Sequence, residues 1–133
     1  MNSKQVGNQG EKIAIDYLKS KGYRILDKNY VFKIPGSPSK GEIDIIAKKK
    51  DVISFVEVKT ITNIGEGPSS FFAPEEKVNF QKRRKISKIA ESWLIKKQIL
   101  LNSKWQIDII AIEINPPHKP KISHFENAVS SID

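Results

Sequence analysis

The sequence contains no cysteine, only three arginines and no apolar stretch long enough to span a membrane. Without cysteine the chain can form neither a disulfide nor a thiolate zinc site, and it offers no thiol nucleophile. A membrane-spanning helix needs about 20 mostly apolar residues. The first twelve residues, MNSKQVGNQGEK, also lack the apolar segment of a signal peptide. We therefore expect a cytoplasmic protein with no membrane partner.

Positive charge is the main compositional feature that is present. Lys and Arg number 23 against 15 acids, which gives a formal net charge of +8. Such a balance is typical of proteins that bind nucleic acid. Because bidentate reading of guanine usually requires arginine, a lysine-rich chain favours contacts to the phosphate backbone with little base specificity. A lysine-rich solvated surface is the alternative explanation.

The length of 133 residues and the hydrophobic content of 38% predict one domain over residues 1–133. We place its core at about residues 5–115 and a C-terminal extension at 116–133. Between them, the polar and glycine-rich segment 60–75 is predicted to be a flexible loop. Its Phe71 and Phe72 either touch substrate as part of a flap or pack under the following helix.

Hydrophobic periodicity predicts an α/β fold with the element order α-β-β-β-α-β(-β). The sheet is mixed, with an antiparallel three-strand meander flanked by helices. The predicted elements are a helix at 6–21, strands at 23–32, 41–47 and 52–60, a helix at 76–97, a strand at 105–114 and a short edge strand at KISHFE.

Two neighbouring strands, GEIDIIA and VISFVEVKT, carry charged residues where strands usually hold apolar ones: Asp44, Glu57 and Lys59. A hairpin centred on residues 49 and 50 would set Ala47 opposite Val52 and Asp44 opposite Phe55. Since side chains alternate along a strand, all three charged residues would then share one face. The other face would carry the apolar set Ile43, Ile45, Ala47, Ile53, Val56 and Val58.

In that register Asp44 and Glu57 are diagonal neighbours, with Cβ atoms roughly 7 to 8 Å apart. Two carboxylates at this spacing can hold one cation, and an all-oxygen site without cysteine favours Mg²⁺ or Mn²⁺. The alternative is a simple ion pair between Lys59 and one acid on a solvated sheet face.

The predicted first helix contributes another acid, Glu11, which borders the apolar stripe instead of the solvated side. Gly7 and Gly10 beside it would let another chain segment approach closely. The alternative role for Glu11 is a favourable interaction with the helix dipole.

The second predicted helix carries a row of polar and basic residues suited to a phosphate backbone, although a solvated face explains it nearly as well. The row consists of Lys77, Gln81, Lys82, Arg83, Arg84 and Lys88. Near the C-terminus, His118 and His124 are interpreted as surface residues.

Five segments together resemble the PD-(D/E)XK nuclease superfamily, and more closely the YraN family of predicted bacterial endonucleases related to archaeal Holliday junction resolvases. They are GNQGEKIAIDYLKSKGY, GEIDIIA, FVEVKT, KVNFQKRRKISKIAESWL and IDIIAIE. The resemblance covers roughly residues 5–115 and implies a restriction-endonuclease-like core. Asp108 matches the family pattern, whereas Arg83 after Lys82, and Gln106, depart from it.

The resemblance implies a Mg²⁺-dependent or Mn²⁺-dependent endonuclease that hydrolyses phosphodiester bonds in DNA, including branched or junction DNA. It implies Glu11, Asp44 and Glu57 as metal ligands and Lys59 as the fourth catalytic residue. A homodimer follows if the resolvase resemblance extends to assembly. Two alternatives stay open: a non-catalytic nucleic-acid-binding module with a vestigial site, and an interaction protein whose acids form a structural ion-pair cluster.

Overall fold

The computed structural model describes residues 2–33, 35–36, 38, 40–62 and 80–128, without the side chains of residues 3 and 80–84. The element order and the predicted mixed α/β fold are confirmed, including the short edge strand. Within the described residues the elements are α1 (Ser3–Ser20), β1 (Arg24–Lys33), β2 (Lys40–Lys49), β3 (Val52–Thr62), α2 (Phe80–Lys96), β4 (Trp105–Ile114) and β5 (Lys121–Phe125).

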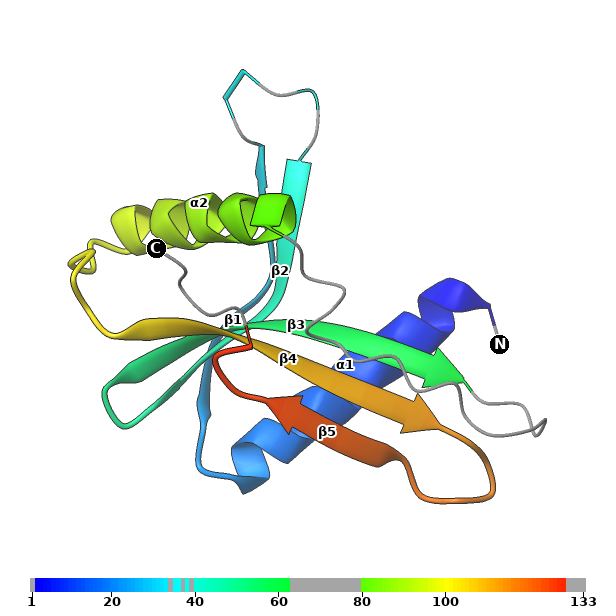
Figure 1. Cartoon of the computed structure of the whole chain (residues 1–133). Coiled ribbons are helices and arrows are strands. Elements are labelled where there is room, and N and C mark those ends of the chain that lie inside the picture. The colour runs from blue at the N-terminus through cyan, green and yellow to red at the C-terminus, as the bar shows by residue number, and fades with distance from the viewer. Residues whose placement is uncertain (1, 34, 37, 39, 63–79, 129–133) are drawn as a thin grey trace.

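The five strands form one mixed sheet in the order β1-β2-β3-β4-β5. All neighbouring pairs are antiparallel except β3 and β4, which run parallel because the chain returns through the segment that contains α2. Helix α1 packs on one face of the sheet and α2 on the other (Figure 1). Both faces are therefore covered.

Helix α1 begins three residues earlier than its apolar pattern predicts. The Asn2 side chain accepts a hydrogen bond from the Gln5 backbone N–H, and the Gln5 side chain accepts one from the Asn2 backbone, at 2.8 and 2.9 Å. This capping box satisfies two backbone donors that the first turn would leave unpaired. Gly22, with φ of 95°, lies just beyond the helix end, as predicted. Among the described residues, neither helix is long and apolar enough to cross a bilayer.

The predicted β2–β3 register is wrong by two residues. Lys49 pairs with Val52 and Ala47 with Ser54, so the turn consists of Lys50 and Asp51. Lys50 adopts φ of 56°, which allows a tight turn and extends both strands. Since the shift is an even number of residues, it does not change which residues of β2 and β3 share a face within the paired stretch.

The apolar residues of β2 and β3 divide between two cores instead of sharing one face. Ile43 and Ile53, predicted to lie with Val56, pack against α2 together with Phe55. The cluster on the α1 side contains Ala14, Leu18, Ile45, Ala47, Val56, Ile110, Ile112 and Ile114. The single-face prediction was wrong for two reasons. Ile53 and Val56 are three residues apart, so alternation puts them on opposite faces, and the alternation of β2 is interrupted between Ile43 and Ile46, which lie on the same side.

Candidate functional site

Asp44 lies where the β2–β3 ladder ends. The described pairing of the two strands stops at Ile45 and Val56. Just beyond it, the Asp44 Oδ2 atom accepts a hydrogen bond of 2.8 Å from the backbone N–H of Val58. The carboxylate therefore serves as the acceptor for β3 at the point where the pairing between the backbones ends.

Burial and neighbouring acids raise the pKa of Asp44 to about 7. Burial is the largest cause, and the charges of Glu11, Glu42 and Glu57 raise it further, while the Val58 N–H lowers it. Four acids are thus close enough to interact around one strand end. A cation bound among them would relieve this repulsion.

Glu11 and Asp44 line the same pocket, of about 490 Å³, between the first half of α1 and the sheet. Burial, and then the charge of Glu42, raise the pKa of Glu11, while a hydrogen bond with the Asn29 side chain and the charge of Lys28 lower it. The structure therefore brings together the acid predicted on the helix and the acid predicted on β2.

The spacing between α1 and β3 depends on Gly10, since a Cβ atom there would overlap the Thr60 side chain. A Cβ atom added at Gly7 would meet no other atom within 4 Å. We expect Gly10→Ala to lower the free energy of unfolding by about 1–3 kcal/mol, because the helix must move away from β3. Gly7→Ala, the matched control, should raise it by up to about 1 kcal/mol through helix propensity. Denaturant unfolding of both variants checks this pair, and equal effects would contradict it.

Glu42 is an acid of this cluster that the sequence analysis missed. It is exposed on β2, yet its charge raises the pKa of both Glu11 and Asp44. The signal was present, because Glu42 stands two residues before Asp44 and alternate residues of a strand share a face.

Glu57 and Lys59 form an ion pair on β3, with Lys59 Nζ 3.0 Å from Glu57 Oε1. Their side chains are 19% and 33% exposed, and the Glu57 Oε2 atom is buried. Glu57 does not line the pocket of Glu11 and Asp44, although its charge acts on Asp44. On β3, Val58 and Thr60 line the pocket, whereas Ile53 and Phe55 pack on the α2 side. Because β3 alternates regularly, Glu57 and Lys59 lie on the α2 side, and the prediction that they share one face with Asp44 was wrong.

The chemistry of these residues fits a hard divalent cation, since carboxylate oxygens are its preferred protein ligands. Glu11 and Asp44 are the acids that share a pocket, and Glu57 is engaged by Lys59. Within the part of the chain that the structure describes, no three Asp, Glu, His or Cys side chains are grouped closely enough to hold a metal ion. The support for a cation therefore comes from the carboxylate side chains and from the raised pKa of Asp44, and not from a ready-made group of three ligands in the described residues.

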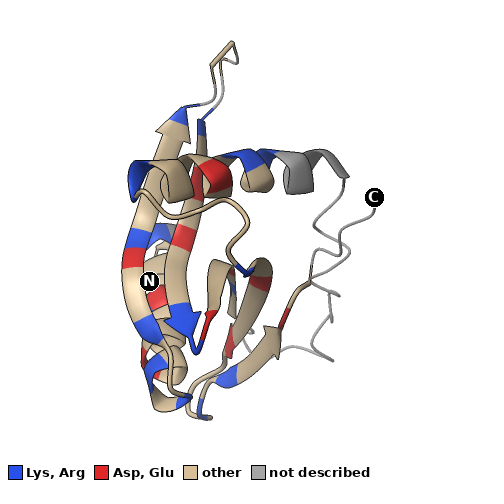
Figure 2. Cartoon of the chain, turned by 90° about the vertical axis from the view of Figure 1, so that its left-hand side faces the viewer, with Lys and Arg blue, Asp and Glu red and all other residues tan. Residues whose placement is uncertain are grey.

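The predicted nucleic-acid-binding row lies mostly outside the described residues. Lys77 falls in the segment 63–79, as do Phe71 and Phe72. Gln81, Lys82, Arg83 and Arg84 belong to α2, but their side chains are outside the described part. Lys88 is exposed, and Figure 2 shows that basic positions outnumber acidic ones along the described part of α2.

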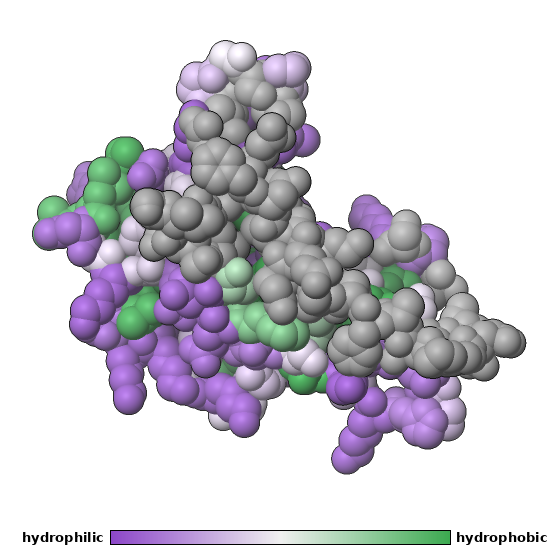
Figure 3. All heavy atoms as spheres, in the orientation of Figure 1, coloured by the Kyte–Doolittle hydropathy of each residue, from purple (hydrophilic) through white to green (hydrophobic). Residues whose placement is uncertain are grey.

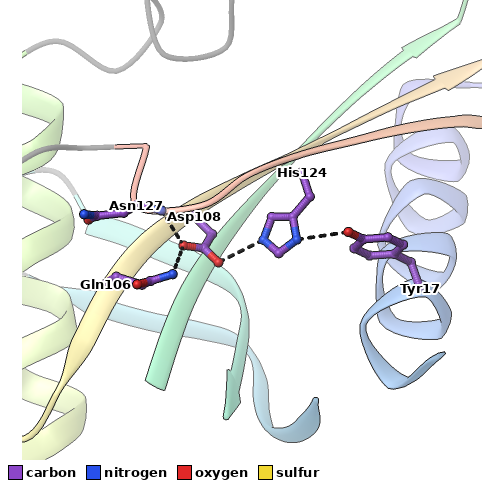
Figure 4. A network of polar contacts seen from close by, with 5 residues as sticks. All are labelled: Tyr17, Gln106, Asp108, His124 and Asn127. Atoms are coloured by element: carbon purple, nitrogen blue, oxygen red, sulfur yellow. Dashed lines mark hydrogen bonds and ion pairs between the residues drawn. The ribbon is translucent and has the colours of Figure 1, made fainter. Parts of the chain in front are cut away.

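A second polar cluster joins α1, β4 and β5 (Figure 4). Asp108 is fully buried, and its Oδ2 atom lies 2.9 Å from His124 Nε2. Its Oδ1 atom accepts hydrogen bonds from the Gln106 side chain and the Asn127 backbone, both at 2.9 Å. His124 Nδ1 lies 3.2 Å from the Tyr17 hydroxyl. The cluster therefore ties the first helix to the last strand.

The prediction that His124 lies on the surface was wrong. Its side chain is only 7% exposed, because β5 pairs with β4 and turns the ring inward between Asp108 and Tyr17. His118, in the connection between β4 and β5, is exposed as predicted.

The fold and the two clusters define a small mixed α/β protein with a carboxylate pocket between its first helix and its sheet. The chain belongs to uncharacterised protein family UPF0102, whose sequence profile matches residues 10–112. UPF0102 is the YraN family that the sequence motifs resemble, so the predicted family is confirmed.

Similar proteins cover nearly the whole chain. A UPF0102 protein of Clostridioides difficile is 44% identical over 128 residues, which are 96% of this chain and 99% of the relative. A UPF0102 protein of Caldanaerobacter subterraneus subsp. tengcongensis is 42% identical over 130 residues, 96% of this chain and 97% of the relative.

Proposed function

We propose that this protein is a metal-dependent endonuclease that hydrolyses phosphodiester bonds in DNA. The observation that carries the proposal is Asp44, a partly buried acid in a pocket with Glu11, whose pKa is raised to about 7 by burial and by the charges of three glutamates, with Lys59 on the adjacent strand. Such a perturbed acid in a pocket is typical of a functional site. The net charge of +8 supports a polyanionic substrate.

In this proposal Glu11 and Asp44 would hold Mg²⁺ or Mn²⁺ in their shared pocket, and Glu57 would be the third ligand, reaching the cation where β2 and β3 no longer pair. When bound, the cation lowers the pKa of a water molecule and polarises the scissile phosphate. Lys59 donates hydrogen bonds to the phosphoryl oxygens or orients the attacking water, and Glu57 keeps its ammonium group in place. The lysines on the exposed side of α2 bind the flanking phosphates.

The deciding experiment incubates the protein with labelled junction, flap, duplex and single-stranded DNA, with Mg²⁺, Mn²⁺ or a chelator. We expect metal-dependent cleavage of at least one substrate. Loss of the Lys59 ammonium should reduce the cleavage rate about 100-fold or more. The control is Lys19→Ala, which removes one exposed lysine in the last turn of α1 and should leave the rate unchanged. Intact substrates under all conditions would refute the proposal.

A non-catalytic nucleic-acid-binding module is the second candidate, favoured by the Glu57–Lys59 ion pair, which engages one of the proposed metal ligands. For this candidate, DNA would bind without cleavage in every metal. Binding should then weaken steeply with added salt, because contacts to phosphates release counterions. The same binding titration with Lys59→Ala separates the candidates. If the Glu57–Lys59 pair is only structural, the variant should bind DNA almost as tightly as the wild type, whereas loss of a contact between Lys59 and the phosphoryl oxygens should weaken DNA binding.

A further inference from the structure

A second pocket, of about 650 Å³, lies beside the hairpin that joins β2 and β3. The acid pocket lies at the opposite end of β3, where Thr60 and Thr62 line it. The second pocket is formed by the start of β1, the β2–β3 hairpin, the end of α2 and the connection from α2 to β4. In Figure 1 this is the left-hand end of the molecule. The two pockets have no lining residue in common. The second pocket is therefore a separate feature of the fold, of a volume common among ligand sites.

The floor of this pocket is apolar and well packed. Leu26, Ile53, Trp93 and Ile99 line it, and Ile53 and Trp93 are 3% and 2% exposed. The Trp93 indole N–H donates a hydrogen bond of 3.1 Å to the Asp27 carboxylate. The indole therefore adds no unpaired donor to the floor. Leu26 and Ile99, which are only partly buried, are the floor side chains that an occupant can contact.

The rim of this pocket is cationic. Arg24, Lys48, Lys97 and Lys104 stand around it with a single acid, Asp51. Lys104 Nζ lies 3.0 Å from Asp51 Oδ2, but both side chains are about 70% exposed, at 72% and 68%. An exposed pair of this kind is weak, so Lys104 can turn to an anion at little cost. Figure 3 shows hydrophilic side chains gathered around small apolar areas at this end of the molecule.

We propose that this pocket binds a nucleotide, with the phosphate at the cationic rim and the base on the apolar floor. Asn102 and Ser103 also line the pocket and supply an amide and a hydroxyl that can pair with the edge of a base. An aliphatic anion would leave Asn102, which is exposed, and Ser103, which is partly buried, to water, so it would gain no hydrogen bonds from them. Inorganic phosphate would leave the apolar floor unused. Binding at this pocket would be separate from cleavage, because none of the residues assigned to the acid site lines it.

The test follows the indole N–H signal of Trp93 by NMR while ligands are added. Deoxyadenosine monophosphate should shift this signal to saturation. Deoxyadenosine, inorganic phosphate and octyl phosphate should each bind at least about tenfold more weakly, since each lacks one half of the recognised group. Equal binding of octyl phosphate, or no saturable shift with the nucleotide, would overturn the proposal.

Charge variants of the rim provide a matched pair. Lys97→Ala should weaken nucleotide binding about threefold to tenfold, whereas Asp51→Asn should strengthen it, because the single acid of the lining is removed. Lys119→Ala, in the connection between β4 and β5 at the opposite end of the molecule, should have no effect. Lys59→Ala, which disables the proposed acid site, should also bind the nucleotide normally. If Lys97→Ala and Asp51→Asn bind as tightly as the wild type, the rim does not hold the phosphate.

Discussion

Asp44→Asn is expected to raise the free energy of unfolding by about 2–4 kcal/mol near pH 8 in the presence of a chelator. The pKa of this acid rises from 3.8 to about 7 on folding, because of burial and of the charges of Glu11, Glu42 and Glu57. A tenfold change in proton affinity corresponds to about 1.4 kcal/mol, which sets the upper end of the range. Asparagine keeps an oxygen for the Val58 N–H and removes the charge.

The sign of the pH dependence follows from the raised pKa. Between about pH 4 and pH 7 the folded protein holds the Asp44 proton more tightly than the unfolded chain does, so the wild type loses stability as pH rises through this window. Above it the contribution is constant. Asp44→Asn should lack this loss, and the difference between the two proteins should grow from small near pH 4 to its maximum near pH 8.

Denaturant unfolding of the wild type and the variant across this pH range measures the effect. Asp16→Asn, at an exposed position on α1, controls for the loss of one acid from the chain. The prediction fails if the difference between wild type and Asp44→Asn is the same at every pH. In the proposed function the same variant loses cleavage, so stability and activity would change in opposite directions.

Asp108→Ala is expected to lower the free energy of unfolding by about 3–5 kcal/mol. The fully buried carboxylate accepts hydrogen bonds from the Gln106 side chain and the Asn127 backbone, and it is paired with His124. Alanine would leave these groups without their acceptor inside the protein, which costs more than the net contribution of the bonds themselves.

A double-mutant cycle of Asp108→Ala with His124→Ala separates the pair from general loss of packing. Because the two side chains are in contact, the double variant should be less destabilised than the sum of the single variants by about 1–3 kcal/mol. His118→Ala, at an exposed histidine, should be nearly neutral. A loss of less than about 1 kcal/mol for Asp108→Ala would contradict the assigned role.

The order of elements could be predicted from the sequence because it follows from apolar periodicity, which is strong in both helices and in the long strands. The start of α1 was predicted three residues too late, although Asn2 and Gln5 have the spacing of a capping box that marks it. The β2–β3 register was not readable, because nothing in Lys48-Lys49-Lys50-Asp51 indicates that Lys50 adopts a positive φ.

The candidate site divides in the same way. The convergence of Glu11 and Asp44 could be predicted, because each position borders a buried stripe or interrupts an apolar strand. The burial of His124 could not, because it depends on the pairing of β5 with β4, which places it next to an acid 16 residues earlier. Contacts between strands are set by the whole sheet and leave no local signal.

The hydrogen bond from the Val58 N–H to Asp44 makes the exchange of this amide with solvent depend on a side chain and not on a neighbouring backbone. Amides inside the β2–β3 ladder exchange with solvent only when neighbouring backbones separate, whereas this amide is shielded by a side-chain oxygen at the end of the ladder. Its protection therefore follows rotation and protonation of one carboxylate instead of global opening of the sheet. Val58 thus gives a local, residue-specific measure of how firmly the Asp44 carboxylate is held at the end of the ladder.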